Sequence, residues 1–288
     1  MRTITSRQNP LVTKFRAVHT GHSPRQHLLL DGTRLIDDAQ ATNTPIEVAL
    51  FSAAALRAGD RQLGELADTL AASGTEVLAA SAAVIAAASP VRTPSGVVAL
   101  ATYKAYPLDR IVTDAGSGLV VVAVGVQDPG NVGAIIRAAD AGGARAIVVT
   151  GGSADPFGWR ALRGAMGSSL RLPVGLVDDL PALIVAARTR GAKVVATIPR
   201  GGTGLYEADL TGPRLLLVGQ EGAGLEPTID SRADIRVSVP MRSRVDSLNV
   251  GIAAALIIYE ARRQVLRRRR GGGLRSRRRR PGAKGSDR

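Results

Sequence analysis

Three segments of the chain, which we call the glycine-rich segments, hold side chains that could do chemistry; the first two contain several glycines and the third contains Pro240 and Gly251. They are residues 128–144, 215–227 and 237–260. Each follows a β-branched or aliphatic run typical of a strand, and the first and third continue directly into an apolar helix. The first N–H groups of a helix have no partner within it, so such junctions can bind a ligand or stabilise developing negative charge. The candidate catalytic side chains in these segments are Asn131, Arg137, Glu221, Ser247 and Asn249.

Phosphate-binding patterns are the first alternative for glycines that follow strands. Gly125 and Gly130 have the P-loop spacing, but Asn131 stands where that loop needs its lysine. The segment starting at Gly222 approaches G-x-G-x-x-G, but Pro227 replaces the third glycine. Neither pattern is complete, which argues against a nucleoside-triphosphatase and against a nicotinamide oxidoreductase.

The three segments share another property, which is a lining of backbone rather than of long side chains. In an open α/β sheet the ligand lies at the carboxyl ends of the strands, where all three segments are placed. Glycine and proline there leave amides and carbonyls accessible. Such a lining suits a flat, neutral group such as adenine.

Composition excludes several other classes. The chain has 288 residues, no cysteine, 45% hydrophobic residues and 3% aromatics. Absence of cysteine rules out disulfides, iron–sulfur clusters and thiol nucleophiles. The three histidines lie within residues 19–27 and match no ligand motif, so we expect no metal site. The first residues are polar and no apolar run approaches the roughly 20 residues of a membrane span, which favours a cytoplasmic protein without a membrane partner.

Positive charge is concentrated at one end of the chain. The net charge is +14, but residues 262–288 hold thirteen Lys or Arg and one acid, a sum of +12, which leaves +2 for the rest. Like-charge repulsion and glycine content predict a disordered tail over 267–288. Such a tail can neutralise RNA phosphates, although a solubilising extension is the alternative.

The order of predicted elements indicates an α/β protein with two domains. Residues 1–105 alternate helices and strands, with a strand at 27–30 and a helix from Thr33. Residues 106–118 resemble a linker, because Pro107, Asp109, Gly116 and Gly118 interrupt the pattern. Residues 119–266 contain five or six strands with helices between them, which predicts a doubly wound parallel sheet. The expected strands are 119–126, 146–150, 172–177, 194–198, 215–218 and 235–239, and the expected helices are 132–141, 182–189 and 250–266.

The three glycine-rich segments resemble the motifs of the SpoU (TrmH-type) branch of the SPOUT RNA methyltransferases. The resemblance is carried by Asp128-Pro129-Gly130-Asn131-Val132-Gly133 with Arg137, by Gly219-Gln220-Glu221-Gly222, and by Val239-Pro240-Met241 with Ser247-Leu248-Asn249. It implies S-adenosylmethionine as cofactor and a ribose 2′-hydroxyl as acceptor. It also implies a deep trefoil knot in the parallel-sheet domain and a homodimer that packs through that domain. The apolar helix 250–266 suits a dimer face, with an intramolecular core helix as the alternative.

The resemblance also assigns roles to single residues. Gly219, Val239, Met241 and Leu248 would hold the cofactor. Arg137 would act at the target ribose, either as the base or, since a guanidinium stays protonated, by binding phosphate and stabilising an alkoxide. Glu221 would orient Arg137 or cap a helix, and Ser247 and Asn249 would face the ribose and its phosphate. Plain structural roles remain open: Asn131 and Ser247 as N-caps, and Arg137 as a solvated charge.

The N-terminal region resembles the ribosomal-protein-like RNA-binding domain that precedes many SpoU domains, with Asp31 where the family more often has Glu. This implies Arg7, Lys14 and Arg16 as RNA-binding residues, and Arg163 in the second domain matches another family arginine. Arg163 could equally belong to a solvated face.

Ribosomal RNA, in particular 23S rRNA, is the favoured substrate. A transfer RNA enzyme of the same family, a base-nitrogen methyltransferase and a non-catalytic RNA-binding relative remain alternatives.

Overall fold

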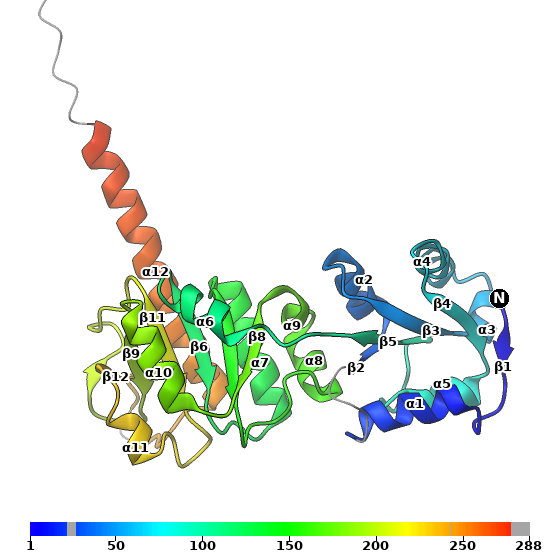
Figure 1. The fold of residues 1–288 in the computed structure, drawn as a ribbon, viewed down its shortest axis with the longest axis horizontal. Helices are drawn as coiled ribbons and strands as arrows, with labels where there is room; N and C mark the ends of the chain where they lie inside the picture. The colour runs from blue at the N-terminus through cyan, green and yellow to red at the C-terminus, as the bar shows by residue number, and fades with distance from the viewer. Residues whose placement is uncertain (22–26, 243, 278–288) are drawn as a thin grey trace, which may run out of the picture.

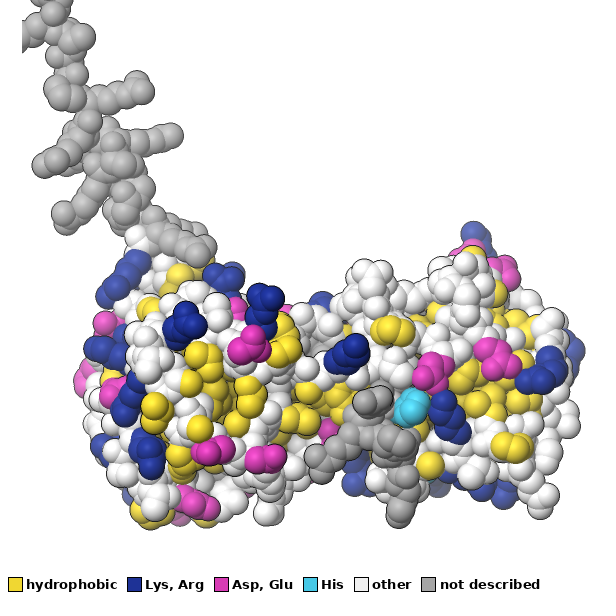
Figure 2. Space-filling model, viewed as in Figure 1, with side chains coloured by type: hydrophobic (Ala, Val, Ile, Leu, Met, Phe, Trp, Pro, Cys, Tyr) yellow, Lys and Arg dark blue, Asp and Glu magenta, His cyan; other side chains and the backbone are white. Residues whose placement is uncertain are grey.

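Two α/β units lie side by side along the long axis of the molecule (Figure 1). Both units carry Lys and Arg side chains on the face shown in Figure 2. The computed structural model describes residues 1–21, 27–242 and 244–277, with backbone alone from residue 269 onward. Both units have the mixed helix and strand content expected from the sequence, which confirms the α/β class. The trefoil knot stays a prediction.

The first unit is built on a five-stranded mixed sheet of order β1-β4-β3-β5-β2. Strand β5 pairs antiparallel with β2 and β3, while β1, β4 and β3 run parallel. The strands are β1 (Thr3–Ile4), β2 (His27–Asp31), β3 (Ile46–Ser52), β4 (Glu76–Ala80) and β5 (Val97–Thr102). The helices are α1 (Pro10–His19), α2 (Thr33–Ala41), α3 (Ala53–Arg57), α4 (Arg61–Ala72) and α5 (Ala82–Ala88).

The second unit contains a parallel sheet of order β10-β12-β9-β11-β6-β7-β8. The strands are β6 (Leu119–Ala123), β7 (Ala146–Thr150), β8 (Val174–Val177), β9 (Lys193–Thr197), β10 (Thr203–Gly204), β11 (Arg214–Val218) and β12 (Ile235–Ser238). Five or six strands were expected. The additional strand, β10, is two residues long and too short to produce a periodic signal.

Alternating residues of this sheet face two different helix layers. Val121 and Leu216 pack in the cluster that includes α7 (Pro129–Gly142), α8 (Trp159–Ala165) and α12 (Val250–Arg277). Val120 and Leu215 pack in the cluster that includes α6 (Leu108–Ala115) and α10 (Leu180–Thr189). Two short helices, α9 (Ser168–Arg171) and α11 (Pro227–Asp230), complete the unit.

The expected linker contains a helix that belongs to the second unit. Ile111 and Ala115 of α6 are fully buried against the sheet, at a spacing of four residues. Pro107 lies at the N-cap position, and Gly116 at the C-cap. The residues that suggested a linker are therefore the start and stop signals of a short helix.

The basic tail also departs from the expectation. Helix α12 continues to Arg277, so the backbone of residues 267–277 is helical where disorder was predicted. It projects away from the second unit (Figure 1). Residues 278–288 lie outside the described part of the chain. No described helix combines the length and apolar character needed to cross a membrane.

Helix α7 and helix α8 approach each other closely at Gly133. A Cβ atom there would lie 2.5 Å from the carbonyl oxygen of Ala161 and 2.9 Å from the backbone nitrogen of Ala165. Both neighbours are backbone atoms, so the contact cannot relax by a side-chain rotation. Glycine at 133 is what allows α7, the helix that carries Asn131 and Arg137, to pack at this distance.

We therefore expect Gly133→Ala to lower the free energy of unfolding by about 1–3 kcal/mol, the usual cost of overpacking. The matched control is Gly64→Ala in α4, where a Cβ meets no atom within 4 Å. That variant should gain about 0.5–1 kcal/mol from helix propensity. Urea denaturation of both variants measures the difference, and equal stabilities would contradict the packing argument.

Candidate active site

A pocket opens at the carboxyl ends of strands β9, β11 and β12. It encloses about 100 Å³ and is lined by residues that follow each of these strands. All four expected cofactor-binding residues line it, together with two of the expected catalytic residues. They are Gly219, Val239, Met241, Leu248, Glu221 and Ser247.

Backbone and aliphatic groups dominate this pocket, and Glu221 is the one charged residue among the described residues that line it. A lining without Lys or Arg does not suit a phosphate, in agreement with the incomplete phosphate motifs. It suits a neutral ring held by main-chain hydrogen bonds, and the carboxylate favours a ligand that carries positive charge.

The loop after β11 folds tightly back on itself beside the pocket. The backbone N–H of Gln220 donates to the carbonyl of Gly224 at 3.1 Å, and the N–H of Gly224 donates to the carbonyl of Gln220 at 3.0 Å. Gly222 and Gly224 have φ values of 78° and 71°, in the left-handed region. A Cβ at Gly219 would collide with the backbone of Gly224. Glycine therefore shapes this wall of the pocket.

A hydrogen-bonded chain, which we call the amide relay, joins the three glycine-rich segments. Asn131 donates through Nδ2 to Oε1 of Glu221 at 2.5 Å, and it accepts at Oδ1 from Nδ2 of Asn249 at 2.9 Å. Asn249 in turn accepts at Oδ1 from the backbone N–H groups of Gly251 and Ile252, at 2.9 and 3.2 Å. The relay thus connects the loop after β11, the first turn of α7 and the first turn of α12.

The helix caps differ from those expected. Asp128, and not Asn131, caps α7, because its carboxylate accepts from the N–H of Asn131 at 2.8 Å. Asn249, and not Ser247, caps α12 through the two backbone contacts above. Ser247 therefore lines the pocket without serving as that cap.

Arg137 lies outside both the pocket and the amide relay. Its side chain is exposed on α7, and Nη1 lies 3.0 Å from the sulfur of Met166. Glu221 hydrogen-bonds Asn131, so the structure does not show the contact by which Glu221 was expected to orient Arg137. Within the described part of the chain Arg137 forms no ion pair, which leaves the guanidinium available to an anionic ligand.

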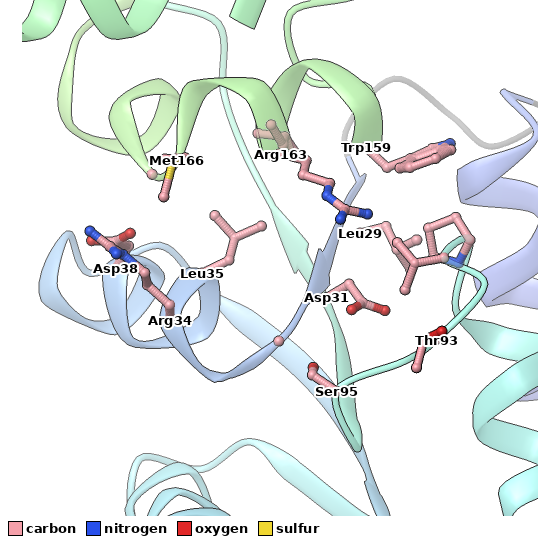
Figure 3. Close-up of a pocket in the computed structure, with 15 residues that line it drawn as sticks. Leu29, Asp31, Arg34, Leu35, Asp38, Thr93, Ser95, Trp159, Arg163 and Met166 are labelled. Atoms are coloured by element: carbon pink, nitrogen blue, oxygen red, sulfur yellow. The ribbon is translucent and has the colours of Figure 1, made fainter. Parts of the chain in front are cut away.

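The expected RNA-binding residues are divided between two places. Arg7, in the turn before α1, and Arg16 of α1 are exposed, and Lys14 of the same helix pairs with Glu47 at 2.6 Å. Lys14 is therefore partly neutralised. Arg163 belongs to α8 and lines a cavity at the junction of the two units (Figure 3).

Sequence reasoning missed one wall of the pocket. Thr197, which ends β9, lines the pocket together with Ile198 and Pro199, which follow that strand. They carry no glycine-rich motif or helix-start signal. Only the position of β9 beside β11 and β12 in the sheet brings them to the site.

The double role of Asn249 leads to a stability prediction. Asn249→Ala removes both the cap and the donor to Asn131, and we expect a loss of about 1 kcal/mol, within the 0.5–2 kcal/mol usual for caps. Asn249→Ser keeps a capping oxygen and should lose less. Thermal and urea unfolding of the alanine and serine variants separate the loss of the cap from the loss of the hydrogen bond to Asn131. An alanine variant as stable as the parent would refute the capping role.

Comparison with known proteins places these observations in a family. Residues 118–259 match the family described as SpoU rRNA Methylase. An uncharacterised tRNA/rRNA methyltransferase of Synechocystis sp. is 35% identical over 90% of this chain and 93% of its own length. A 23S rRNA uridine 2′-O-methyltransferase of Streptomyces viridochromogenes is 33% identical, over 90% and 91% of the two chains.

A solved structure agrees with the fold over nearly the whole chain. The AdoMet-bound rRNA methyltransferase of Sinorhizobium meliloti superposes with a TM-score of 0.80 at 31% identity. It covers 92% of this chain and 98% of its own. Since the pocket, the three motifs and the full-length relatives agree, the chain belongs to the SpoU rRNA methylase family.

Proposed function

We propose that the protein transfers a methyl group from S-adenosylmethionine to a ribose 2′-hydroxyl of 23S ribosomal RNA. The observation that carries the proposal is the backbone-lined pocket, whose described lining includes the carboxylate of Glu221 but no Lys or Arg, connected by the amide relay to the first turn of α7. The Streptomyces relative is named as a 23S rRNA 2′-O-methyltransferase, and the Sinorhizobium structure holds the methyl donor.

The residues of the pocket fit this cofactor. Backbone groups near Gly219, Val239 and Leu248 can hydrogen-bond an adenine, and Ile198 and Met241 can cover its faces. Bound S-adenosylmethionine supplies a methyl group already activated by its sulfonium charge. Glu221 is the anionic group beside this pocket and favours that charge.

The chain's own residues then position the acceptor. Arg137 is an exposed cation on the helix that starts at the relay, so it can bind an RNA phosphate and stabilise the alkoxide that forms at the ribose. A guanidinium remains protonated at neutral pH, so Arg137 acts by charge and does not remove the proton itself. Correct placement of two reactants contributes roughly 7–11 kcal/mol in favourable cases.

A second copy of the chain completes the proposal. Ile252, Leu256 and Tyr259 are 55%, 39% and 53% exposed, at the spacing of one face of α12. The opposite face, with Ala254, Ile257 and Ile258, is buried against α7 and the sheet. We propose that this exposed face joins two subunits in a homodimer. Such an interface starts beside Asn249 and thus beside the relay.

The ribose and a base nitrogen are the two acceptors to be distinguished. Total RNA made with and without the protein, digested to nucleosides and analysed by mass spectrometry, should differ in a ribose-methylated nucleoside. A base-methylated product would replace the proposal with base methylation. Failure to bind S-adenosylmethionine in isothermal titration would favour a non-catalytic RNA-binding role.

We expect Arg137→Ala to abolish turnover. Its affinity for the cofactor should stay within about tenfold (1.4 kcal/mol) of the parent's, because Arg137 does not line the pocket. The control is Arg110→Ala, an exposed arginine on α6 at the other face of the sheet, which should keep full activity. Single-turnover methylation and titration calorimetry measure the two quantities. An active Arg137→Ala enzyme removes Arg137 from the mechanism.

We expect Leu256→Glu to raise the dissociation constant of the dimer by about a hundredfold or more, and so to favour the monomer. A buried leucine contributes about 1.5–3 kcal/mol, and a two-fold interface contains the change twice. Val185→Glu is the matched control, since Val185 is 56% exposed on α10, away from α12. Sedimentation equilibrium gives the result; a dimer of unchanged strength would exclude this face.

A further inference from the structure

A cavity of about 290 Å³ lies where the two units meet, separate from the cofactor pocket. Its lower wall comes from the end of β2 and the start of α2, and its upper wall comes from α8 (Figure 3). Its volume is near the lower end of small-ligand pockets, about 300 Å³, which suits one flat ring system rather than a large ligand.

Apolar side chains form most of the surface of this cavity. Trp159, Leu35, Leu29 and Leu162 line it, and Trp159 also packs against the core of the N-terminal unit. RNA bases that leave a helical stack bind between aromatic and aliphatic side chains of this kind. The walls therefore suit the faces of a nucleobase.

Four of the described charged residues line the cavity: Asp38, which pairs with Arg171, then Arg34, and the two opposite charges Asp31 and Arg163. Asp31 at the end of β2 and Arg163 on α8 both line it, and Figure 3 shows Arg163 reaching from α8 toward the strand that carries Asp31. The structure shows no ion pair between them within the described residues. Asp31 accepts at Oδ2 from the hydroxyl of Ser89 at 2.5 Å, which fixes the carboxylate. Oδ1 and the second lone pair of Oδ2 can still accept from a ligand.

Partial burial beside the cavity costs the carboxylate of Asp31 part of its solvation by water. Burial raises the pKa of Asp31, and the hydrogen bond from Ser89 and the charge of Arg163 oppose that rise. A carboxyl group with a raised pKa that lines a cavity is a candidate ligand-binding group.

We propose that this cavity binds a guanine base of the substrate RNA, an inference that rests on the methyltransferase function proposed above. Guanine presents two adjacent N–H donors, at N1 and N2, which match the carboxylate of Asp31. Its O6 and N7 are the acceptors that a guanidinium such as that of Arg163 binds. Trp159 provides a stacking surface for the ring.

The other bases match this pair of charges less well. Adenine and cytosine present one amino group to a carboxylate, and the N3–H of uracil lies between two carbonyl oxygens that repel it. Guanine alone offers two donors next to an acceptor in the order that Asp31 and Arg163 require.

The cavity also connects to the proposed reaction centre. Met166 lines it at the end of α8, and the Met166 sulfur contacts the guanidinium of Arg137 at 3.0 Å. Arg34 lines the same cavity and forms no ion pair among the described residues. When a nucleotide places its base in this cavity, its phosphates can therefore contact Arg34 and Arg137 on the side toward α7.

The test uses Trp159, which is the only tryptophan of the chain, so its fluorescence reports on this cavity. The full-length protein is titrated with GMP, AMP, CMP and UMP. We expect GMP to quench Trp159 with a dissociation constant at least about tenfold below that of UMP, as base-specific pairs discriminate. Asp31→Asn should reduce that preference to within about twofold.

Asp68→Asn is the control, because Asp68 is an exposed carboxylate on α4 of the same unit and does not line the cavity. It should bind GMP like the parent. Arg163→Gln, at an exposed position, is a second variant that should weaken GMP binding even if Asp31→Asn folds poorly. Equal quenching by the four nucleotides, or an unchanged preference in both variants, overturns the guanine pocket.

This result is independent of the methyltransferase test. Methyl transfer and S-adenosylmethionine binding with no GMP preference reject the cavity inference and leave the proposed function intact. A GMP preference that depends on Asp31, in a protein that does not bind S-adenosylmethionine, rejects the proposed function and supports the cavity.

Discussion

The amide relay is the constraint on which the site depends. Asn131 can donate to Glu221 and accept from Asn249 only when the loop after β11 and the starts of α7 and α12 are close together. An amide is the side chain suited to this position, because it donates at one atom and accepts at the other. A carboxylate at 131 would repel Glu221, and an aliphatic residue would leave Asn249 without an acceptor.

The parallel sheet supplies the proximity that the relay needs. Strand β11 lies between β6 and β9, and β12 lies on the other side of β9, so the segments that follow β6, β11 and β12 meet at one edge. Small residues then allow the helices to reach that edge. Gly133 permits the approach of α8 to α7, and a Cβ at Gly142 would collide with Ile258 of α12. Thus glycines of the first motif segment also determine how closely α7 packs against α8 and α12.

Much of this organisation was predictable from the sequence, for identifiable reasons. Continuous aliphatic runs such as 119–123 indicate buried parallel strands, and helix starts after glycine-rich turns place the site at their carboxyl ends. Local patterns could not decide which polar group caps which helix, since Asp128 and Asn131, or Ser247 and Asn249, are equally plausible caps. They also could not predict the wall after β9 or the cavity at Asp31, because both depend on contacts between segments far apart in the chain.

The contact between the two units gives the N-terminal unit a direct connection to the site. One continuous core includes Leu30 of β2, Leu162 of α8 and Ile136 of α7. At its edge Arg171 pairs with Asp38 of α2 at 2.8 Å and with Asp140 of α7 at 3.2 Å. Exposed pairs of this kind contribute little alone, but one cation shared between two helices fixes their relative position. A base recognised beside α2 would therefore be held at a defined distance from Arg137, one turn of α7 before Asp140.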